Sequence, residues 1–141
     1  MRRSKYSLLE KYLILDQLIG RIRDDDKLCI VVEGFSDFEK LRKIGVKGKI
    51  FILNKFRIEE IIRYTLENNY KMLILTDYDH EGVMLEKKIR KIALSYGVRL
   101  IDGFRNELRK LSCELGYEIS DILDNYIRLS MLFNYKVDTS I

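Results

Sequence analysis

The sequence predicts an α/β fold in which about four parallel strands are flanked by helices, with further helices at both ends of the chain. Short apolar runs alternate with stretches of helical periodicity through the middle of the sequence. This alternation is typical of parallel strands joined by right-handed crossovers. Two of the apolar runs end in carboxylates followed by a glycine. Because ligands of open α/β sheets bind beyond the carboxyl ends of the strands, the same pattern predicts where a functional site lies.

The composition is that of one globular domain spanning residues 1–141. The chain is 47% apolar and 34% charged, with a formal net charge of +4, which permits contact with a polyanion without requiring it. Two cysteines and one histidine exclude a disulfide framework and argue against a zinc site. No apolar run is long enough to span a bilayer and no secretory segment follows the basic start, so we expect a cytoplasmic protein without a membrane partner.

The first expected element is a helix over residues 5–22. Its apolar residues recur at steps of three and four, which is the spacing of one helix face: Leu8, Tyr12, Leu15, Ile19 and Ile22. Three aspartates at 24–26 then mark a solvated turn. The α/β core is expected over residues 28–101, with strands at 28–32, 49–53, 72–76 and 98–101.

Helices are expected between these strands at 36–43, 58–68 and 82–96. Ser36 followed by Glu39 is a capping-box pattern for the first of them. Gly97 is expected to end the last one, because a glycine readily adopts the left-handed conformation found just past a helix end. Residues 103–134 return to helical periodicity in two stripes separated by Gly116, which predicts C-terminal helices.

Three carboxylates are expected to converge at the carboxyl edge of the sheet. Glu33 follows four apolar strand residues, and Asp77 and Asp79 follow a later strand at a spacing that aims both to one side of an extended chain. Carboxylates that share a small volume need a compensating cation, and hard oxygen ligands suit Mg²⁺. An acidic pair at a strand-to-helix turn also serves as a helix cap, so the D-x-D is a weak indication without Glu33.

These motifs, V-E-G-x-x-D, then a second strand, then T-D-x-D-x-E-G, resemble the Toprim domain. That domain is shared by type IA and type II topoisomerases, bacterial-type primases, OLD-family nucleases and the ribonuclease M5 group. The resemblance covers residues 28–101 and implies a Rossmann-like Toprim core. The small size of the chain is similar to that of the stand-alone Toprim proteins of archaea and the ribonuclease M5-like group.

The resemblance also implies roles for the acids. Asp77 and Asp79 would bind Mg²⁺, with Mn²⁺ as an alternative, and Glu33 would act as a general acid or base or help to hold the metal. Flanking residues of the two motifs are expected behind or beside the metal ligands: Gly34, Asp37, Glu81 and Gly82. Asp37 equally fits a role in the favourable interaction of an acid with a helix N-terminus.

Polar and basic residues near the same edge are expected to bind phosphate. Asn54, Lys55 and Arg57 follow the second strand, so they should lie at the carboxyl edge with the acids. Lys87 and Lys88 lie on the helix that follows the D-x-D. The pattern of these two lysines fits a solvent-exposed helix face at least as well as it fits phosphate binding.

The resemblance therefore implies a Mg²⁺-dependent nucleic-acid-processing protein, most simply a nuclease that hydrolyses phosphodiester bonds in RNA or DNA. A chain of this length lacks room for the gate domains of topoisomerases or the template-binding region of primases. Tyr78 is interpreted as a packing or stacking ring rather than a nucleophile, and His80 as an exposed loop residue. The alternative is a non-catalytic, metal-dependent nucleic-acid-binding module, and the apolar terminal helices leave open a homodimer or a larger complex. A nucleotide-binding domain ranks last, because neither G-x-G-x-x-G nor a P-loop is present.

Overall fold

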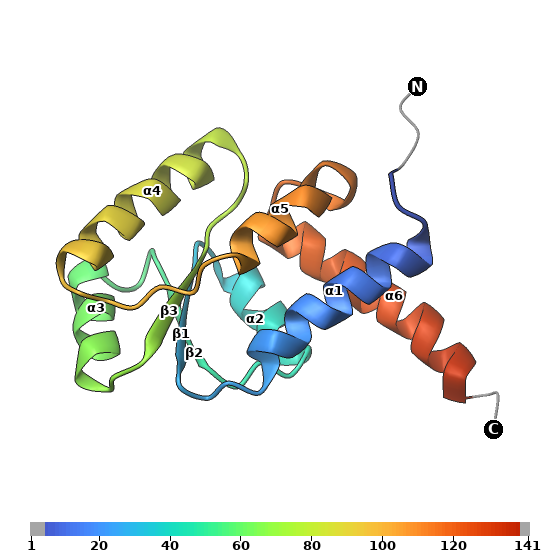
Figure 1. The fold of residues 1–141 in the computed structure, drawn as a ribbon, viewed down its shortest axis with the longest axis horizontal. Helices are drawn as coiled ribbons and strands as arrows, with labels where there is room; N and C mark the ends of the chain where they lie inside the picture. Colours follow the sequence, from blue (N-terminus) through green and yellow to red (C-terminus); the bar gives the residue numbers. More distant parts are fainter. Residues whose placement is uncertain (1–4, 139–141) are drawn as a thin grey trace.

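A computed structural model describes residues 5–138, and the side chains of residues 5–134. In this part of the chain, helices surround a three-stranded parallel sheet (Figure 1). The strands are β1 (Leu28–Val32), β2 (Lys49–Ile52) and β3 (Lys71–Leu75). Their order is β2-β1-β3, and Val32 at the end of β1 is level with the ends of both neighbours. The predicted α/β class with a parallel sheet flanked by helices is confirmed.

The sheet separates two apolar clusters because alternate strand residues point to opposite faces. On one face, Ile30 and Leu73 pack with α1 (Leu8–Arg23), α2 (Phe35–Lys43), α5 (Phe104–Leu115) and α6 (Ile119–Asp138). On the other face, Val31 packs with α3 (Ile58–Glu67) and α4 (His80–Ser95). All five residues of β1 are buried, as expected for the central strand of a covered sheet.

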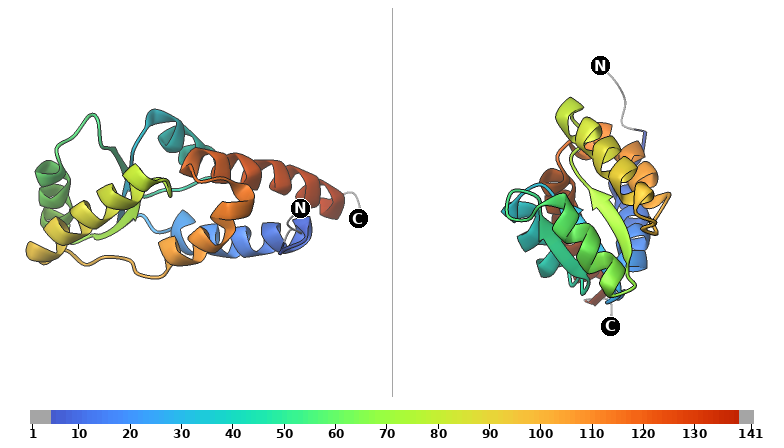
Figure 2. Two further views of the ribbon diagram at one scale, coloured as in Figure 1. Left: turned by 90° about the horizontal axis from the view of Figure 1, so that it is seen from above. Right: turned by 90° about the vertical axis from the view of Figure 1, so that its left-hand side faces the viewer.

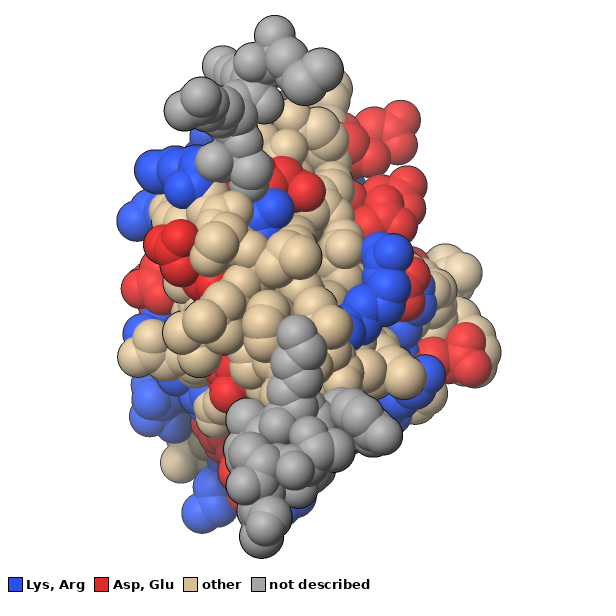
Figure 3. Space-filling model, turned by 90° about the vertical axis from the view of Figure 1, so that its right-hand side faces the viewer, with Lys and Arg blue, Asp and Glu red and all other residues tan. Residues whose placement is uncertain are grey.

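The terminal helices extend away from the sheet, which lies at one end of an elongated molecule (Figure 2). They are held together by aromatic and polar contacts: the Tyr12 ring stacks on Phe133 with centroids 5.5 Å apart, and the Tyr126 hydroxyl donates to Asp16 at 2.6 Å. The end of the molecule formed here presents charges of both signs around an uncharged centre (Figure 3). No helix in the described range is both long and apolar enough to cross a membrane.

The expected fourth strand is reduced to a single parallel bridge between Met72 and Leu100. Only two backbone hydrogen bonds join the segment to β3, from Met72 to the Arg99 carbonyl and from Ile101 to the Met72 carbonyl. The chain then turns at Gly103, whose φ of +93° suits glycine, and enters α5. This early turn leaves the segment too short to continue the ladder.

Three helix starts differ from the expectation. Helix α1 begins at Leu8 instead of residue 5, because Ser7 is its N-cap. Helix α2 begins at Phe35, and the capping acid is Asp37, whose Oδ2 accepts from the Gly34 amide at 3.1 Å, so Ser36 is not the cap. Helix α4 begins at His80 instead of residue 82, because Asp79 is its N-cap. The starts of α2 and α4 are therefore set by acids that accept hydrogen bonds from the free amides at the beginning of each helix.

Candidate functional site

Glu33 and Asp77 lie side by side beyond the carboxyl ends of β1 and β3. These strands are paired, so the residues that follow Val32 and Leu75 leave the same edge of the sheet. Glu33 Oε2 accepts a hydrogen bond from the Asp77 backbone amide at 2.7 Å. This contact spans 44 residues of sequence and ties the first acidic motif to the second.

Asp77 is held from the opposite side by the C-terminal helices. Its Oδ1 accepts from the backbone amide of Ile119, the first residue of α6, at 2.8 Å. Its carbonyl accepts from Arg105 Nη2 at 2.9 Å, and the Thr76 carbonyl accepts from Arg105 Nη1 at 2.5 Å. Arg105 belongs to α5, so two helices outside the expected 28–101 core position this acid.

Asp79 and Gly82 close the loop that follows Asp77. Asp79 Oδ1 accepts from the Gly82 amide at 2.7 Å, which is the N-cap contact of α4. The Thr76 hydroxyl donates to the Gly82 carbonyl at 2.7 Å. A Cβ at position 82 would lie 2.1 Å from the Asp77 carbonyl oxygen, so only glycine fits here without moving the backbone. The alternative interpretation of the D-x-D as a helix cap is thus correct for Asp79.

Burial and mutual repulsion shift the titration of two acids. The pKa of Glu33 is raised by burial and by the charges of Asp77 and Asp79, against the lowering effect of the Asp77 amide. The pKa of Asp37 is raised to about 6, first by burial and then by Asp77 and Glu118. A group of acids with raised pKa values is one whose charge is poorly compensated by the protein itself, which is the setting in which a bound cation is favoured.

The donor chemistry of the site fits Mg²⁺. Glu33, Asp77 and Asp79 each use one oxygen to accept a backbone N–H. The Glu33 and Asp77 carboxyl groups also lie within hydrogen-bonding reach of each other, a contact that raises the pKa of Glu33. Over residues 5–134, no group of three or more His, Cys, Asp or Glu side chains is placed so that it could hold a metal ion, so the three predicted acids do not form such a group. Mg²⁺ is usually bound through one or two carboxylates and keeps several waters, so an acidic pair is a sufficient protein contribution.

The remaining predicted neighbours differ in exposure, and Gly34 is half-buried. Gly82 and Asp37 are buried, while Glu81 is exposed on the first turn of α4. His80 is exposed but starts α4, so its interpretation as a loop residue is wrong. Tyr78 is a buried packing ring: its hydroxyl donates to the Arg105 carbonyl at 2.7 Å, and the Arg105 guanidinium lies 4.5 Å from its ring centroid.

The predicted phosphate contacts come from two elements, the turn after β2 and helix α4. Asn54, Lys55 and Arg57 are exposed in the turn between β2 and α3. The Lys55 ammonium lies 5.5 Å from the centroid of the Phe35 ring, which places this cation beside the start of α2, the helix that follows the Glu33 motif. Lys87 and Lys88 are exposed on α4.

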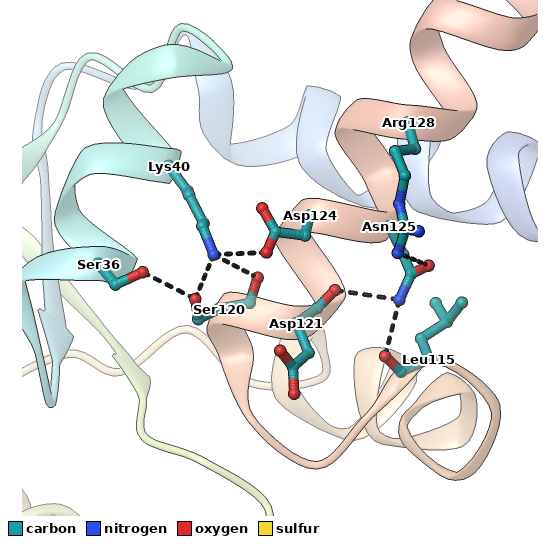
Figure 4. Close-up of polar contacts among 8 residues, drawn as sticks. All are labelled: Ser36, Lys40, Leu115, Ser120, Asp121, Asp124, Asn125 and Arg128. Carbon is teal, nitrogen blue, oxygen red and sulfur yellow. Dashed lines mark hydrogen bonds and ion pairs between the residues drawn. The ribbon is translucent and has the colours of Figure 1, made fainter.

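Sequence reasoning missed the helix corner that supports Asp77. Lys40 of α2 donates to Asp124 Oδ2 at 2.6 Å and to the hydroxyl and carbonyl of Ser120, whose hydroxyl also lies 2.8 Å from that of Ser36 (Figure 4). Asn125 bonds the Leu115 carbonyl at 2.9 Å. These contacts fix the start of α6, whose first amide faces Asp77. They involve ordinary surface residue types, so nothing in the sequence marks them.

No family model matches the sequence. A UPF0292 protein from Thermococcus sibiricus is 35% identical, over 87% of this chain and 96% of its own length. One from Methanocaldococcus jannaschii is 33% identical, over 96% of this chain and 95% of its own length. A solved structure of a putative protein from Aquifex aeolicus matches 76% of this chain and 96% of its own, with a TM-score of 0.66 and 26% identity. The chain belongs to the UPF0292 family.

Proposed function

We propose that this protein is a Toprim-type, Mg²⁺-dependent enzyme that hydrolyses phosphodiester bonds in RNA or DNA, with Mn²⁺ able to replace Mg²⁺. The observation that supports this most directly is the 2.7 Å hydrogen bond from the Asp77 amide to Glu33, because it joins the two acidic motifs at one edge of the sheet. Each motif alone has a structural explanation as a cap or a turn. Neither explanation accounts for why the two motifs meet at the same edge of the sheet.

Asp77 and Asp79 are the proposed metal ligands, through the carboxylate oxygens that the backbone amides leave free. A bound Mg²⁺ neutralises charge on a phosphate and lowers the pKa of its bound water. The protein contributes fixed positions: Ile119 holds the Asp77 carboxylate and Gly82 holds that of Asp79. Ligands held in this way need little reordering when a cation binds.

Glu33 is the proposed general acid or base. Its raised pKa brings proton transfer closer to neutral pH, where a carboxyl of ordinary pKa is a poor acid. It would accept a proton from the attacking water or return one to the leaving oxygen. Lys55 and Arg57, exposed after the neighbouring strand β2, would hold the flanking phosphates.

A non-catalytic, metal-dependent nucleic-acid-binding module is the second candidate. It is favoured by one observation: four acids of the motifs also accept a hydrogen bond from a backbone amide, as a purely structural residue would, and these are Glu33, Asp37, Asp77 and Asp79. Such a module would bind nucleic acid and release no product at any concentration of metal.

A cleavage assay separates the two candidates. Labelled structured RNA, single-stranded DNA and duplex DNA are incubated with the protein and Mg²⁺ or Mn²⁺. We expect product from at least one substrate, and none from the Asp77→Asn/Asp79→Asn variant, since asparagine keeps the amide contacts while removing both charges. The matched control is Asp24→Asn/Asp26→Asn, the same charge change in the exposed turn before β1. Equal cleavage by the Asp77/Asp79 variant and the wild type would refute the assignment.

A further inference from the structure

A polar cleft of about 740 Å³ lies between α4 and α5, and Tyr78 is one of its lining residues. Its volume falls in the range of ligand-binding clefts. Lys87 and Arg90 line it from α4, and Arg105 and Arg109 line it from α5. Glu86 and Asp102 are its acidic lining residues, so cations outnumber acids by four to two in the lining.

Two of the four cations are already committed. Arg90 bonds Glu86 at 2.7 Å and Asp102 at 3.1 Å, so its single charge is used on the two acids of the cleft and offsets one of their two negative charges. Arg105 donates to two backbone carbonyls. Lys87 and Arg109 are exposed, and among residues 5–134 neither side chain makes an ion pair or a hydrogen bond. They are therefore uncompensated charges on opposite walls of one cleft.

The cleft adjoins the acidic loop. Tyr78, which lines it, is the residue between Asp77 and Asp79. Its amide donates to the carbonyl of Tyr117 at 2.6 Å, and the Tyr117 ring, 57% exposed, also lines the cleft. An aromatic ring at the mouth of a basic cleft is the combination that binds single-stranded nucleic acid, with phosphates on the cations and a base stacked on the ring.

We propose that the α4–α5 cleft binds a single-stranded segment of nucleic acid next to the cleaved phosphate, which deepens and rests on the proposed function. Lys87 and Arg109 contact backbone phosphates, and Tyr117 stacks on a base. A single inorganic phosphate is a poorer match, because it engages one charge centre and leaves an open cleft of this size and its aromatic ring unused.

Binding is measured by fluorescence anisotropy of labelled oligo-dT and oligo-U at several salt concentrations. The protein is the full chain carrying Asp77→Asn/Asp79→Asn, so that cleavage and binding are separated. Adding Lys87→Glu/Arg109→Glu should weaken binding and reduce the slope of log K against log salt by about 1.4, for two phosphate contacts on a single strand. Tyr117→Ala should weaken binding roughly fivefold or more. All three side chains are exposed, and circular dichroism checks that each variant is folded.

The matched control is Lys27→Glu/Lys71→Glu, which makes the same charge change at the amino edge of the sheet, where both lysines are exposed. We expect this control to keep the salt slope. An equal loss of binding affinity from the cleft pair and from the control pair would overturn the proposal, and so would no loss from the cleft pair. Competition by free mononucleotide as strong as that by oligonucleotide would overturn the nucleic-acid assignment in favour of a nucleotide. None of these outcomes depends on whether the wild type cleaves.

Discussion

Replacing Gly82 by alanine tests whether the acidic loop is as tightly closed as the structure indicates. The new Cβ would lie 2.1 Å from the Asp77 carbonyl oxygen and 2.6 Å from the carbon, distances that side-chain rotation cannot relieve because both partners are backbone atoms. The loop or the start of α4 must therefore move, which stretches the Asp79–Gly82 cap and the Thr76–Gly82 hydrogen bond, both 2.7 Å long. Overpacking of this kind costs about 1–3 kcal/mol, and loss of the cap adds about 1 kcal/mol.

The assay is urea unfolding followed by circular dichroism, with Gly20→Ala as the matched control. Gly20 is exposed within α1 and nothing lies within 4 Å of the position its Cβ would take, so alanine there should stabilise the protein by about 0.5–1 kcal/mol. The two substitutions add the same methyl group and should move stability in opposite directions. If Gly82→Ala is as stable as the wild type, the loop is not packed as described, and the reasoning about how Asp77 and Asp79 are fixed fails.

Three further predictions concern the supports of the site. Arg105→Met keeps an apolar stem over the Tyr78 ring but leaves two backbone carbonyls without their donor, so it should lower the free energy of unfolding by about 3 kcal/mol; a loss below about 0.5 kcal/mol in urea unfolding would contradict this. The pKa of Asp37 is about 6 in the folded protein against an ordinary value of 3.8, so the folded state binds this proton more tightly and stability falls as pH rises through that window. Asp37→Asn should remove that loss, which is at most about 3 kcal/mol, and parallel unfolding of wild type and variant from pH 4 to 7 would expose an unchanged pH dependence as a failure. Lys40→Met removes the anchor of α6 on α2, and because that ion pair is partly exposed the expected cost is about 1 kcal/mol; thermal unfolding indistinguishable from wild type would show that the anchor adds nothing.

The sheet was predictable because its strands are continuous apolar runs. β1 is buried over its whole length, and a run of this kind between turn residues has few other interpretations. The segment at 98–101 is shorter and is interrupted by Arg99, and it forms one bridge only, since Gly103 turns the chain into α5. The length of a strand depends on the path of the chain that follows it. The composition of the strand itself does not encode that path.

The first cap of α2 shows how two local patterns compete. Ser36 with Glu39 and Gly34 with Asp37 both offer an acid three residues after a cap position. The structure uses Asp37, which is buried, whereas Glu39 is exposed. The start of α2 places Asp37 close enough to Asp77 for that charge to raise the pKa of Asp37. This tertiary proximity cannot be read from the sequence pattern.

Arg105 could not be identified from the sequence. Its hydrogen-bond partners are backbone carbonyls at positions 76 and 77, and a carbonyl is present whatever the residue type. Ile119 is hidden for the same reason, because it contributes only an amide. Carboxylates mark a site in the sequence, while the backbone groups that hold them become visible only in three dimensions.

We propose that Glu33, Asp77 and Asp79 together form a divalent-cation site. Its most direct test is titration of the protein with Mn²⁺, followed by electron paramagnetic resonance and by isothermal calorimetry with Mg²⁺ as competitor. We predict that Mn²⁺ binding is abolished by Asp77→Asn/Asp79→Asn, weakened by Glu33→Gln, and retained by Asp24→Asn/Asp26→Asn. Wild-type affinity in the Asp77/Asp79 variant, or the same loss in the control pair of aspartates, would contradict the account.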